Sequence, residues 1–297
     1  MTPSSRVAWK LTLGIVLSAM VLCAGAAPPD VGTAQALLDT HQRLRDSLVR
    51  SPYGRPLLLD SVETPDGLKG DIYVEVDRPL ADIADALRTP ARWCEMLTLH
   101  INNRRCRVTE GAAGGKTLTL SVVRRYDKPV DSAFELPFAY RLLDAGSTHL
   151  AIDLAAADGP LGTHGYRVTL EAVALDERRS FMHFGYSYEH NTMARFATQT
   201  YLATFGSHKV GFTVLGKGSD GEPDYIRGTR GLVERNAMRY FLTLEAYLAA
   251  PGAGQGEQRR QAWFKGIERY PRQLHEVDLA TYLALKREDR QRDGVAD

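Results

Sequence analysis

The sequence predicts an α+β fold in which a curved antiparallel sheet wraps around a long C-terminal helix. Three observations support this class. A strand is followed directly by two short helices, six strand-like segments then follow one another between turn sequences, and a long amphipathic helix comes after them. Because the strands are apolar on one face only, that face has to be covered, and the C-terminal helices are the predicted cover.

The segments before the six strands contain the opening strand and three helices. Residues 33–50 are predicted to form an amphipathic helix, and residues 57–59 are interpreted as a short apolar connector. Residues 71–76 alternate apolar and polar side chains, as a strand does. A helix then begins at Arg78, breaks at Thr89-Pro90 and resumes as a second short helix that ends at Leu99.

Six further strands are predicted at regular spacing, and a turn containing Gly, Pro or Asp separates each from the next, which is typical of an antiparallel meander. One face of these strands is aliphatic or aromatic, and the other is largely polar. The predicted strands are residues 103–110, 117–126, 133–143, 149–157, 166–175 and 180–190.

The C-terminal third is predicted to be mainly helical. Residues 231–250 form the strongest helix, because Val233, Ala237, Phe241, Leu244 and Leu248 recur on one side of it. The other predicted segments are a helix at 192–205, a short apolar segment at 209–216, a Gly-rich loop at 217–223, a linker at 252–261 and a charged amphipathic helix at 273–290.

The first 26 residues are predicted to be a cleavable secretory signal peptide. Arg6 and Lys10 precede an apolar run at 11–23, and small residues at 24–26 form a cleavage site. This run is too short to span a bilayer, which needs about 20 residues. Two alternatives stay open, an uncleaved N-terminal anchor and a lipoprotein modified at Cys23. We therefore expect a periplasmic or secreted protein.

The overall charge argues against a nucleic-acid-binding protein. Lys and Arg total 37 and Asp and Glu total 36, and removal of Arg6 and Lys10 with the signal peptide would leave a net charge of about −1. This near-neutral balance lacks the clustered basic surplus of a nucleic-acid-binding protein, so no nucleic-acid partner is expected. Four arginine pairs are interpreted as solvated turns and strand edges. They are Arg104-Arg105, Arg124-Arg125, Arg178-Arg179 and Arg259-Arg260.

Two cysteines, Cys94 and Cys106, follow the predicted signal peptide. An oxidising compartment and an even number of cysteines favour a disulfide between them, and two buried free thiols are the alternative. The bridge would stabilise the fold by ~3 kcal/mol on the chain-entropy model. No further Cys or His lies at ligand spacing, so no metal site and no cofactor is expected.

Two stretches resemble the START-like superfamily, also called SRPBCC, whose fold is the helix-grip. They are GDIYVEVDRPLADIADALRTPARWCEML (70–97) and TRGLVERNAMRYFLTLEAYL (229–248), the latter as the closing helix. The resemblance divides the chain into a signal peptide (1–26), an N-terminal helix and connector (27–67), a START-like domain (68–250), and a linker with a helical tail (251–297). It implies an elongated cavity that binds a hydrophobic ligand between the sheet and the closing helix.

The candidate ligand-binding residues are the large aromatic side chains of the inner sheet face and two polar residues of the closing helix. Tyrosine hydroxyls need partners, which suits a pocket with polar groups, and a pocket for such a ligand needs roughly 300 Å³ or more. Alternatively, the rings pack as a solid core, and the arginine pairs with neighbouring acids such as Glu234. The candidates are Phe138, Tyr140, Tyr166, Phe184, Tyr186, Tyr188, Arg235 and Asn236.

No catalytic motif is present: the sequence lacks a Gly-x-Ser-x-Gly elbow, a His-Glu-x-x-His pair, a phosphate loop and a Cys-x-x-Cys pair. His183 and His190 fall on opposite strand faces by parity, so they are not expected to act together. We expect binding or transport of a lipid, sterol-like or polyketide-like molecule, with transient membrane contact. A cyclase or dehydratase in which His190 and Tyr188 transfer protons is one alternative, and a protein-interaction module is another.

Overall fold

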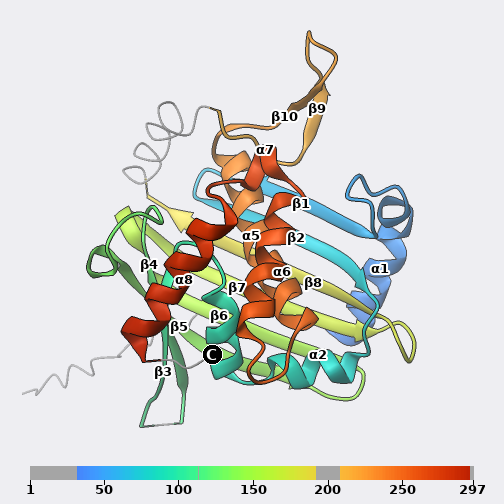
Figure 1. The fold of residues 1–297 in the computed structure, drawn as a ribbon. Helices are drawn as coiled ribbons and strands as arrows, with labels where there is room; N and C mark the ends of the chain where they lie inside the picture. Colours follow the sequence, from blue (N-terminus) through green and yellow to red (C-terminus); the bar gives the residue numbers. More distant parts are fainter. Residues whose placement is uncertain (1–31, 113, 192–207, 295–297) are drawn as a thin grey trace, which may run out of the picture.

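An eight-stranded antiparallel sheet forms the centre of the computed structural model, which describes residues 32–112, 114–191 and 208–294 (Figure 1). The spatial strand order is β1-β2-β8-β7-β6-β5-β4-β3. The strands are β1 (Leu57–Glu63), β2 (Gly67–Val76), β3 (Asn103–Glu110), β4 (Lys116–Val122), β5 (Phe134–Ala145), β6 (His149–Asp158), β7 (Thr163–Ala174) and β8 (Ser180–His190). The predicted signal peptide (1–26) and the predicted helix at 192–205 lie outside the described residues.

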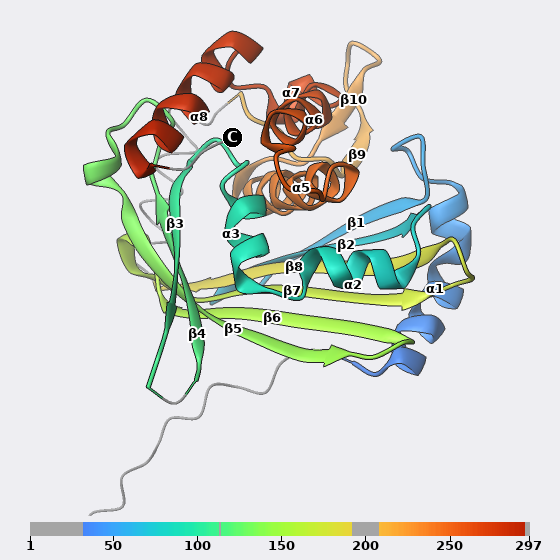
Figure 2. The ribbon, with the colours of Figure 1, turned by 60° about the horizontal axis from the view of Figure 1, so that its bottom comes forward.

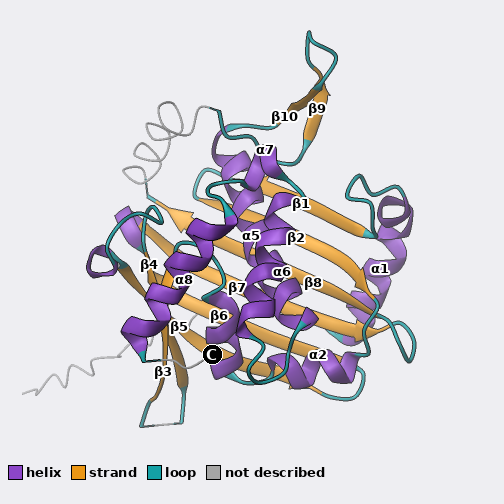
Figure 3. Ribbon diagram, viewed as in Figure 1, coloured by secondary structure: helices purple, strands orange, loops and turns teal. Residues whose placement is uncertain are grey.

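The sheet is curved, and helices cover both of its faces. Figure 2 shows β3 and β4 rising toward the helices, which gather on the concave face, whereas α1 (Ala34–Val49) lies against the other face. The same division between strands and helices is visible in Figure 3. On the outer face, Leu37 and Leu48 of α1 pack with Val173 and Phe181. The predicted α+β class with a curved antiparallel sheet is confirmed.

All six predicted meander strands are present. Their sequences alternate apolar and polar residues, and this alternation is the pattern of a strand with one buried and one exposed face. β2 completes the sheet by pairing with β8, and Ile72 lies opposite Phe184. The edge strand β1 was not predicted: residues 57–59 were interpreted as a connector, but they begin a strand that pairs with β2. Only Leu57 and Leu59 of β1 are buried apolar residues, and Ser61 continues their face, so the apolar pattern is too short to indicate a strand.

Two short helices follow β2, as predicted. They are α2 (Leu80–Leu87) and α3 (Pro90–Leu97), and Pro90 occupies the first turn of α3. The indole N–H of Trp93 donates to the Leu87 carbonyl at 2.8 Å, which joins the end of α2 to α3. The predicted disulfide is confirmed: Cys94 in α3 is bonded to Cys106 in β3.

The long helix α5 (Gly228–Ala249) packs on the concave face against β1, β2 and β8. The predicted apolar side of this helix is buried throughout, from Val233 to Leu248. A Cβ atom at Gly70 of β2 would lie 2.9 Å from the Ala237 Cβ, so the absence of a side chain at Gly70 allows the helix to approach the sheet closely. Phe241 meets Phe184 of β8 with ring centroids 6.4 Å apart.

The C-terminal segment forms three helices that cover α5 and reach β3. They are α6 (Gly256–Glu268), α7 (Pro271–Leu274) and α8 (Leu279–Asp293). The prediction of a linker at 252–261 is wrong from Gly256 onward, because the buried residues Arg259, Arg260 and Trp263 anchor α6. The helix predicted at 273–290 is divided, and Asp278 caps the N-terminus of α8 by accepting from the Thr281 N–H at 2.7 Å.

A small hairpin precedes α5 in the chain and projects away from the sheet (Figure 1). Its strands are β9 (Val214–Lys217) and β10 (Pro223–Tyr225), so the Gly-rich loop predicted at 217–223 forms mainly the hairpin turn. None of the helices among the described residues combines the length and the apolar character that crossing a membrane requires.

Candidate functional site

Tyrosine rings gather on the concave face of the sheet, beside α5. Tyr166 of β7 stacks on Tyr188 of β8 with ring centroids 5.2 Å apart, and Tyr186 lies 6.0 Å from Tyr188. Tyr240 of α5 faces Tyr186, with centroids 5.3 Å apart. Alternation along β8 brings Tyr186 and Tyr188 to the same face, so the predicted aromatic cluster is present there. We call Tyr140, Tyr166, Tyr186, Tyr188 and Tyr240 the tyrosine cluster.

The space beside these rings is much smaller than expected. A cavity of about 20 Å³ is left there, which is room for about one water molecule. The expectation of a cavity of roughly 300 Å³ is therefore wrong for the described residues, because side chains from the sheet, α3 and α5 fill the gap. The lining residues are Leu97, Leu120, Leu136, Phe138, Leu154, Tyr166, Val168, Tyr186 and Tyr240.

The tyrosine hydroxyls differ in their hydrogen bonding. The Tyr166 hydroxyl shares a hydrogen bond with the Thr163 hydroxyl at 2.9 Å. Burial raises the pKa of Tyr186 and of Tyr240, and the side chains of Asn236 and Asn103 partly offset this rise. The Tyr140 hydroxyl is buried and has no hydrogen-bond partner among the described residues. Burial raises the pKa of Tyr140 to about 12 and raises the pKa of Tyr186 well above its usual value. These hydroxyls are therefore protonated at neutral pH. Tyr140 does not itself line the small cavity.

Two other predicted site residues have structural partners elsewhere. Phe184 packs in the core against Phe241 of α5. The guanidinium of Arg235 is buried and donates to the Val210 carbonyl at 3.2 Å, so it holds the segment before β9. Neighbouring Arg239 forms an ion pair with Glu276, which agrees with the alternative that the arginines of this helix pair with acids.

The histidines occupy the faces that strand parity predicted. His183 lies on the outer face, with Nε2 2.7 Å from Asp71 Oδ1 and Nδ1 3.2 Å from Glu171 Oε2. His190 is buried, and its Nδ1 has no hydrogen-bond partner within the part of the chain that the structure describes. Across residues 32–112, 114–191 and 208–294, no cluster of three or more His, Cys, Asp or Glu residues is arranged to hold a metal ion.

Several residues of this site were not among the predicted candidates. The aliphatic residues Leu120, Leu136, Leu154 and Val168 lie on the predicted apolar sheet face, whereas Leu97, Asn103 and Tyr240 come from α3, the start of β3 and α5. Tyr240 lies one helical turn after Asn236, so the two residues share one side of α5. The choice of Asn236 as a ligand-binding candidate could therefore have been extended to Tyr240. The apolar side of α3 contained Leu97, but nothing in the sequence indicated that α3 reaches the tyrosine cluster. Asn103 lies at the start of β3, and its role follows only from the packing of α3 against β3.

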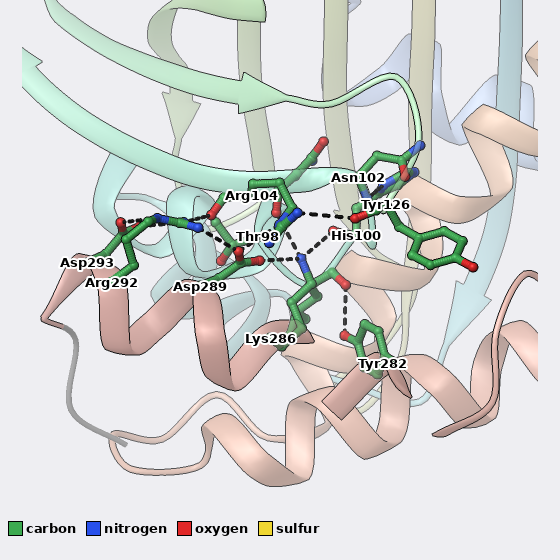
Figure 4. Close-up of polar contacts among 12 residues, drawn as sticks. Thr98, His100, Asn102, Arg104, Tyr126, Tyr282, Lys286, Asp289, Arg292 and Asp293 are labelled. Atoms are coloured by element: carbon green, nitrogen blue, oxygen red, sulfur yellow. Dashed lines mark hydrogen bonds and ion pairs between the residues drawn. The ribbon is translucent and has the colours of Figure 1, made fainter. Parts of the chain in front are cut away.

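A larger pocket of about 380 Å³ lies between α3, β3, α6 and α8. The interpretation of the arginine pairs as solvated is wrong here, because Arg104, Arg259 and Arg260 are buried and line this pocket. Figure 4 shows side chains of α8 reaching toward β3 and the turn before it. The full lining is Cys94, Glu95, Thr98, Leu99, Arg104, Cys106, Ala253, Gly254, Gly256, Arg259, Arg260, Lys286, Asp289, Arg290 and Asp293.

Comparison with known proteins finds solved structures with low sequence identity. Truncated norcoclaurine synthase from Thalictrum flavum is 17% identical over 49% of this chain and 90% of its own, with a TM-score of 0.33. The Zhui aromatase/cyclase from Streptomyces sp. R1128 is 10% identical over 70% of this chain and 95% of its own, with a TM-score of 0.32. A conserved protein from Geobacillus kaustophilus is 10% identical over 61% and 95%, with a TM-score of 0.33.

No protein-family model matches the chain, and no curated protein matches it. Because the identities and TM-scores of the solved structures are low, these likenesses assign no activity and no ligand to this chain. Membership of the START-like superfamily therefore remains a prediction from the sequence.

Proposed function

We propose that this protein binds a small hydrophobic molecule with a flat ring in the tyrosine cluster between the sheet and α5. The observation that carries the proposal is the buried Tyr140 hydroxyl, which has no partner among the described residues and belongs to a side chain packed against the same core as the other four tyrosines. A dry core gains nothing from hydroxyl groups, and each one that stays unbonded costs free energy. A ligand with a polar atom would supply the missing partner.

Binding requires space that the side chains now occupy, and Tyr240 is the residue positioned to yield it. Its ring is half-buried and lies between Tyr186 and His100, with centroids 5.3 and 4.8 Å away. The Tyr240 ring stacks on His100, which supports the proposal that a flat ring can occupy this position. Rotation of Tyr240 toward solvent would vacate a ring-sized volume beside the 20 Å³ cavity.

The opposite wall is less free to move. Leu97 ends α3, and its carbonyl accepts from the Asn103 side chain at 2.8 Å. The disulfide between Cys94 and Cys106 also ties α3 to β3. We therefore assign the opening movement to the Tyr240 side chain of α5, with α3 as a fixed wall.

Among the ligands that the sequence suggested, the site favours a polyketide-like molecule or another with fused or single rings over a long-chain lipid. A ring can replace the ring of Tyr240, whereas a long acyl chain needs an elongated space that the described residues do not leave. Raised pKa values keep Tyr140 and Tyr186 protonated, so both hydroxyls can donate hydrogen bonds to a ligand. We propose binding without turnover, because the sequence contains no catalytic motif.

Titration with N-phenyl-1-naphthylamine, a neutral flat fluorescent probe, tests this function. Wild type is expected to bind it, and Tyr240→Ala at least ~10-fold more tightly, because an emptied apolar site of ring size accepts aromatic molecules. Tyr186→Arg should abolish binding while circular dichroism shows an intact fold. Tyr225→Ala, which removes a tyrosine of the β9–β10 hairpin, serves as the control. Absence of binding by both wild type and Tyr240→Ala would overturn the proposal.

A further inference from the structure

We propose that the C-terminal helix α8 is a clamp that regulates ligand access to the tyrosine cluster. The inference rests on the ligand site proposed above and adds the regulation of that site. The clamp acts on residues 98–103, which connect α3 to β3 and which we call the α3–β3 turn. While α8 holds this turn, Tyr240 stays in place and the cluster is closed. When α8 releases the turn, Tyr240 rotates outward and the cluster opens.

Three side-chain hydrogen bonds fasten α8 to carbonyl groups of the α3–β3 turn (Figure 4). Lys286 Nζ donates to the carbonyls of His100 and Asn103 at 2.8 Å each. The Tyr282 hydroxyl donates to the Leu99 carbonyl, also at 2.8 Å. Tyr282 and Lys286 lie one helical turn apart, on the same side of α8. This side of the helix therefore fixes the backbone path of the turn.

The same turn carries the ring against which Tyr240 packs. The imidazole of His100 stacks on the Tyr240 ring, with centroids 4.8 Å apart. The backbone of the turn orients this imidazole, because its Nδ1 accepts from the Asn102 N–H at 3.1 Å. A change in the backbone of the turn would move the His100 ring away from Tyr240 and remove a contact that keeps Tyr240 inside.

A row of aromatic rings joins α8 to Tyr240 by a second route. Tyr282 stacks on Trp263 of α6, with centroids 4.8 Å apart. The Trp263 ring lies 6.2 Å from His100, which in turn stacks on Tyr240. Packed side chains of this kind are a physical route by which a shift of one helix reaches a distant site. Both the hydrogen bonds and the ring contacts of α8 therefore lead to Tyr240.

The way in which α8 is attached allows it to shift. Its buried residues are Tyr282, Lys286 and Asp289, so two of the three are charged. Most helices in proteins are held by a buried apolar face, whereas polar contacts provide much of the attachment here. The 380 Å³ pocket between α8, α3, β3 and α6 leaves space beside the helix. Asp289 bonds Arg104 of β3 at 2.6 Å, so the C-terminal half of α8 would stay tethered when Lys286 lets go.

This arrangement has two states with different affinities for a ligand. The closed state leaves only about 20 Å³ beside the tyrosine rings, and the open state has room for a ring. The measured affinity falls in proportion to the fraction of molecules that are closed. Weakening the clamp should therefore tighten binding, up to the limit reached by Tyr240→Ala, in which the closing ring is absent.

Titration with N-phenyl-1-naphthylamine tests the clamp. Tyr282→Phe removes one hydroxyl and keeps the ring, and Lys286→Met removes the ammonium group and keeps most of the side-chain length. We expect each variant to bind the probe ~3-fold or more tightly than wild type, because a larger fraction is open. The melting temperature should fall at the same time. Arg287→Met, at an exposed position of the same helix, is the matched control and should bind as wild type does.

A double-mutant cycle separates the clamp from a general structural role. In the Tyr240→Ala background, Tyr282→Phe and Lys286→Met should change the Kd by less than ~1.5-fold, because the ring that they release is already absent. Equal effects in both backgrounds, or clamp variants that bind no more tightly than wild type, would overturn the clamp and leave the ligand site standing. Absence of binding by both wild type and Tyr240→Ala would instead remove the ligand site, and the clamp with it.

Hydrogen exchange provides a readout that needs no ligand. The Asn103 N–H donates to the His100 carbonyl at 3.1 Å, within the turn that Lys286 holds. Lys286→Met should speed exchange at the amides of Asn102 and Asn103, whereas Arg287→Met should leave it unchanged. Wild-type protection of both amides in Lys286→Met and in Tyr282→Phe would show that α8 does not control the turn, and would overturn the clamp.

Discussion

The imidazole Nε2 of His183 lies 2.7 Å from the Asp71 carboxylate, so this residue of β8 bonds an acid on the neighbouring strand β2. On its other side, Glu171 of β7 lies 3.2 Å from Nδ1. Burial alone would lower the pKa of His183, but the hydrogen bonds and charges of the two carboxylates outweigh it, and the pKa is raised. Lys69 and His149 contact the same carboxylates at 3.4 and 3.8 Å.

The first prediction concerns this histidine. A raised pKa means that the stabilisation is fully present below the unfolded-state pKa of about 6.5 and is lost as the pH rises through the folded-state value. His183→Gln should therefore lower the free energy of unfolding by ~1–3 kcal/mol at pH 5.5 and by less at pH 9. Urea unfolding of both proteins at each pH measures the difference. His164→Gln, at an exposed ion pair, is the control, and a difference that grows with pH would contradict the assignment.

The second prediction concerns the buried side of α5. Leu244 is fully buried, so Leu244→Ala should lower the free energy of unfolding by ~2–5 kcal/mol through lost burial and the cavity left behind. Leu215→Ala in the exposed β9 strand should change it by less than ~0.5 kcal/mol. Equal effects of the two substitutions in denaturant unfolding would show that α5 does not pack as described.

The third prediction concerns Glu234, whose buried carboxylate organises the segment before β9. It accepts from the backbone N–H groups of Phe212 and Thr213 at 2.6 and 2.9 Å, and from the Ser61 hydroxyl at 2.7 Å. Glu234→Ala should leave these donors unsatisfied, at a cost of ~1–3 kcal/mol for each donor that water cannot reach.

Hydrogen exchange measured by mass spectrometry should then show faster exchange at Phe212 and Thr213, and Glu234→Gln, which keeps an acceptor, should have a smaller effect. Unchanged protection of both amides in Glu234→Ala would refute the role of this carboxylate.

The fourth prediction concerns the disulfide. Peptide mapping of unreduced, denatured protein should find Cys94 and Cys106 joined, with neither thiol labelled by iodoacetamide. Replacing both cysteines with alanine should reduce the free energy of unfolding by ~3 kcal/mol on the chain-entropy model. Labelling of both thiols in protein kept under oxidising conditions would refute the bridge.

Sequence reasoning predicted the elements whose side-chain period is long and regular. The strands from Asn103 to His190 and the helix α5 each repeat an apolar pattern several times, so local sequence alone determines their type. The strand β1 and the helix α6 lack such a pattern. β1 forms because it pairs with β2. The helix α6 is anchored by its buried side chains, among them Arg259 and Trp263. Both depend on contacts between distant parts of the chain.

The candidate site could be predicted only in part for the same reason. Parity along β8 placed Tyr186 and Tyr188 inside, but whether a cavity remained depended on side chains from α3 and α5. Arg104 is buried because it bonds Asp289, 185 residues further along the chain. No local sequence pattern identifies a partner 185 residues away, so the second pocket could not be predicted from the sequence.

The pairing of β2 with β8 sets an order in which this protein can fold. Asp71 and His183, whose side chains are hydrogen-bonded across these strands, are 112 residues apart, so β2 has no partner on that edge until β8 has been synthesised. At ~5–20 residues per second, synthesis of the intervening chain takes roughly 6–20 s. During that interval the β1–β2 hairpin presents a free strand edge, which favours aggregation or capture by a chaperone. The native sheet is therefore complete only when the final strand of the meander, β8, pairs with β2.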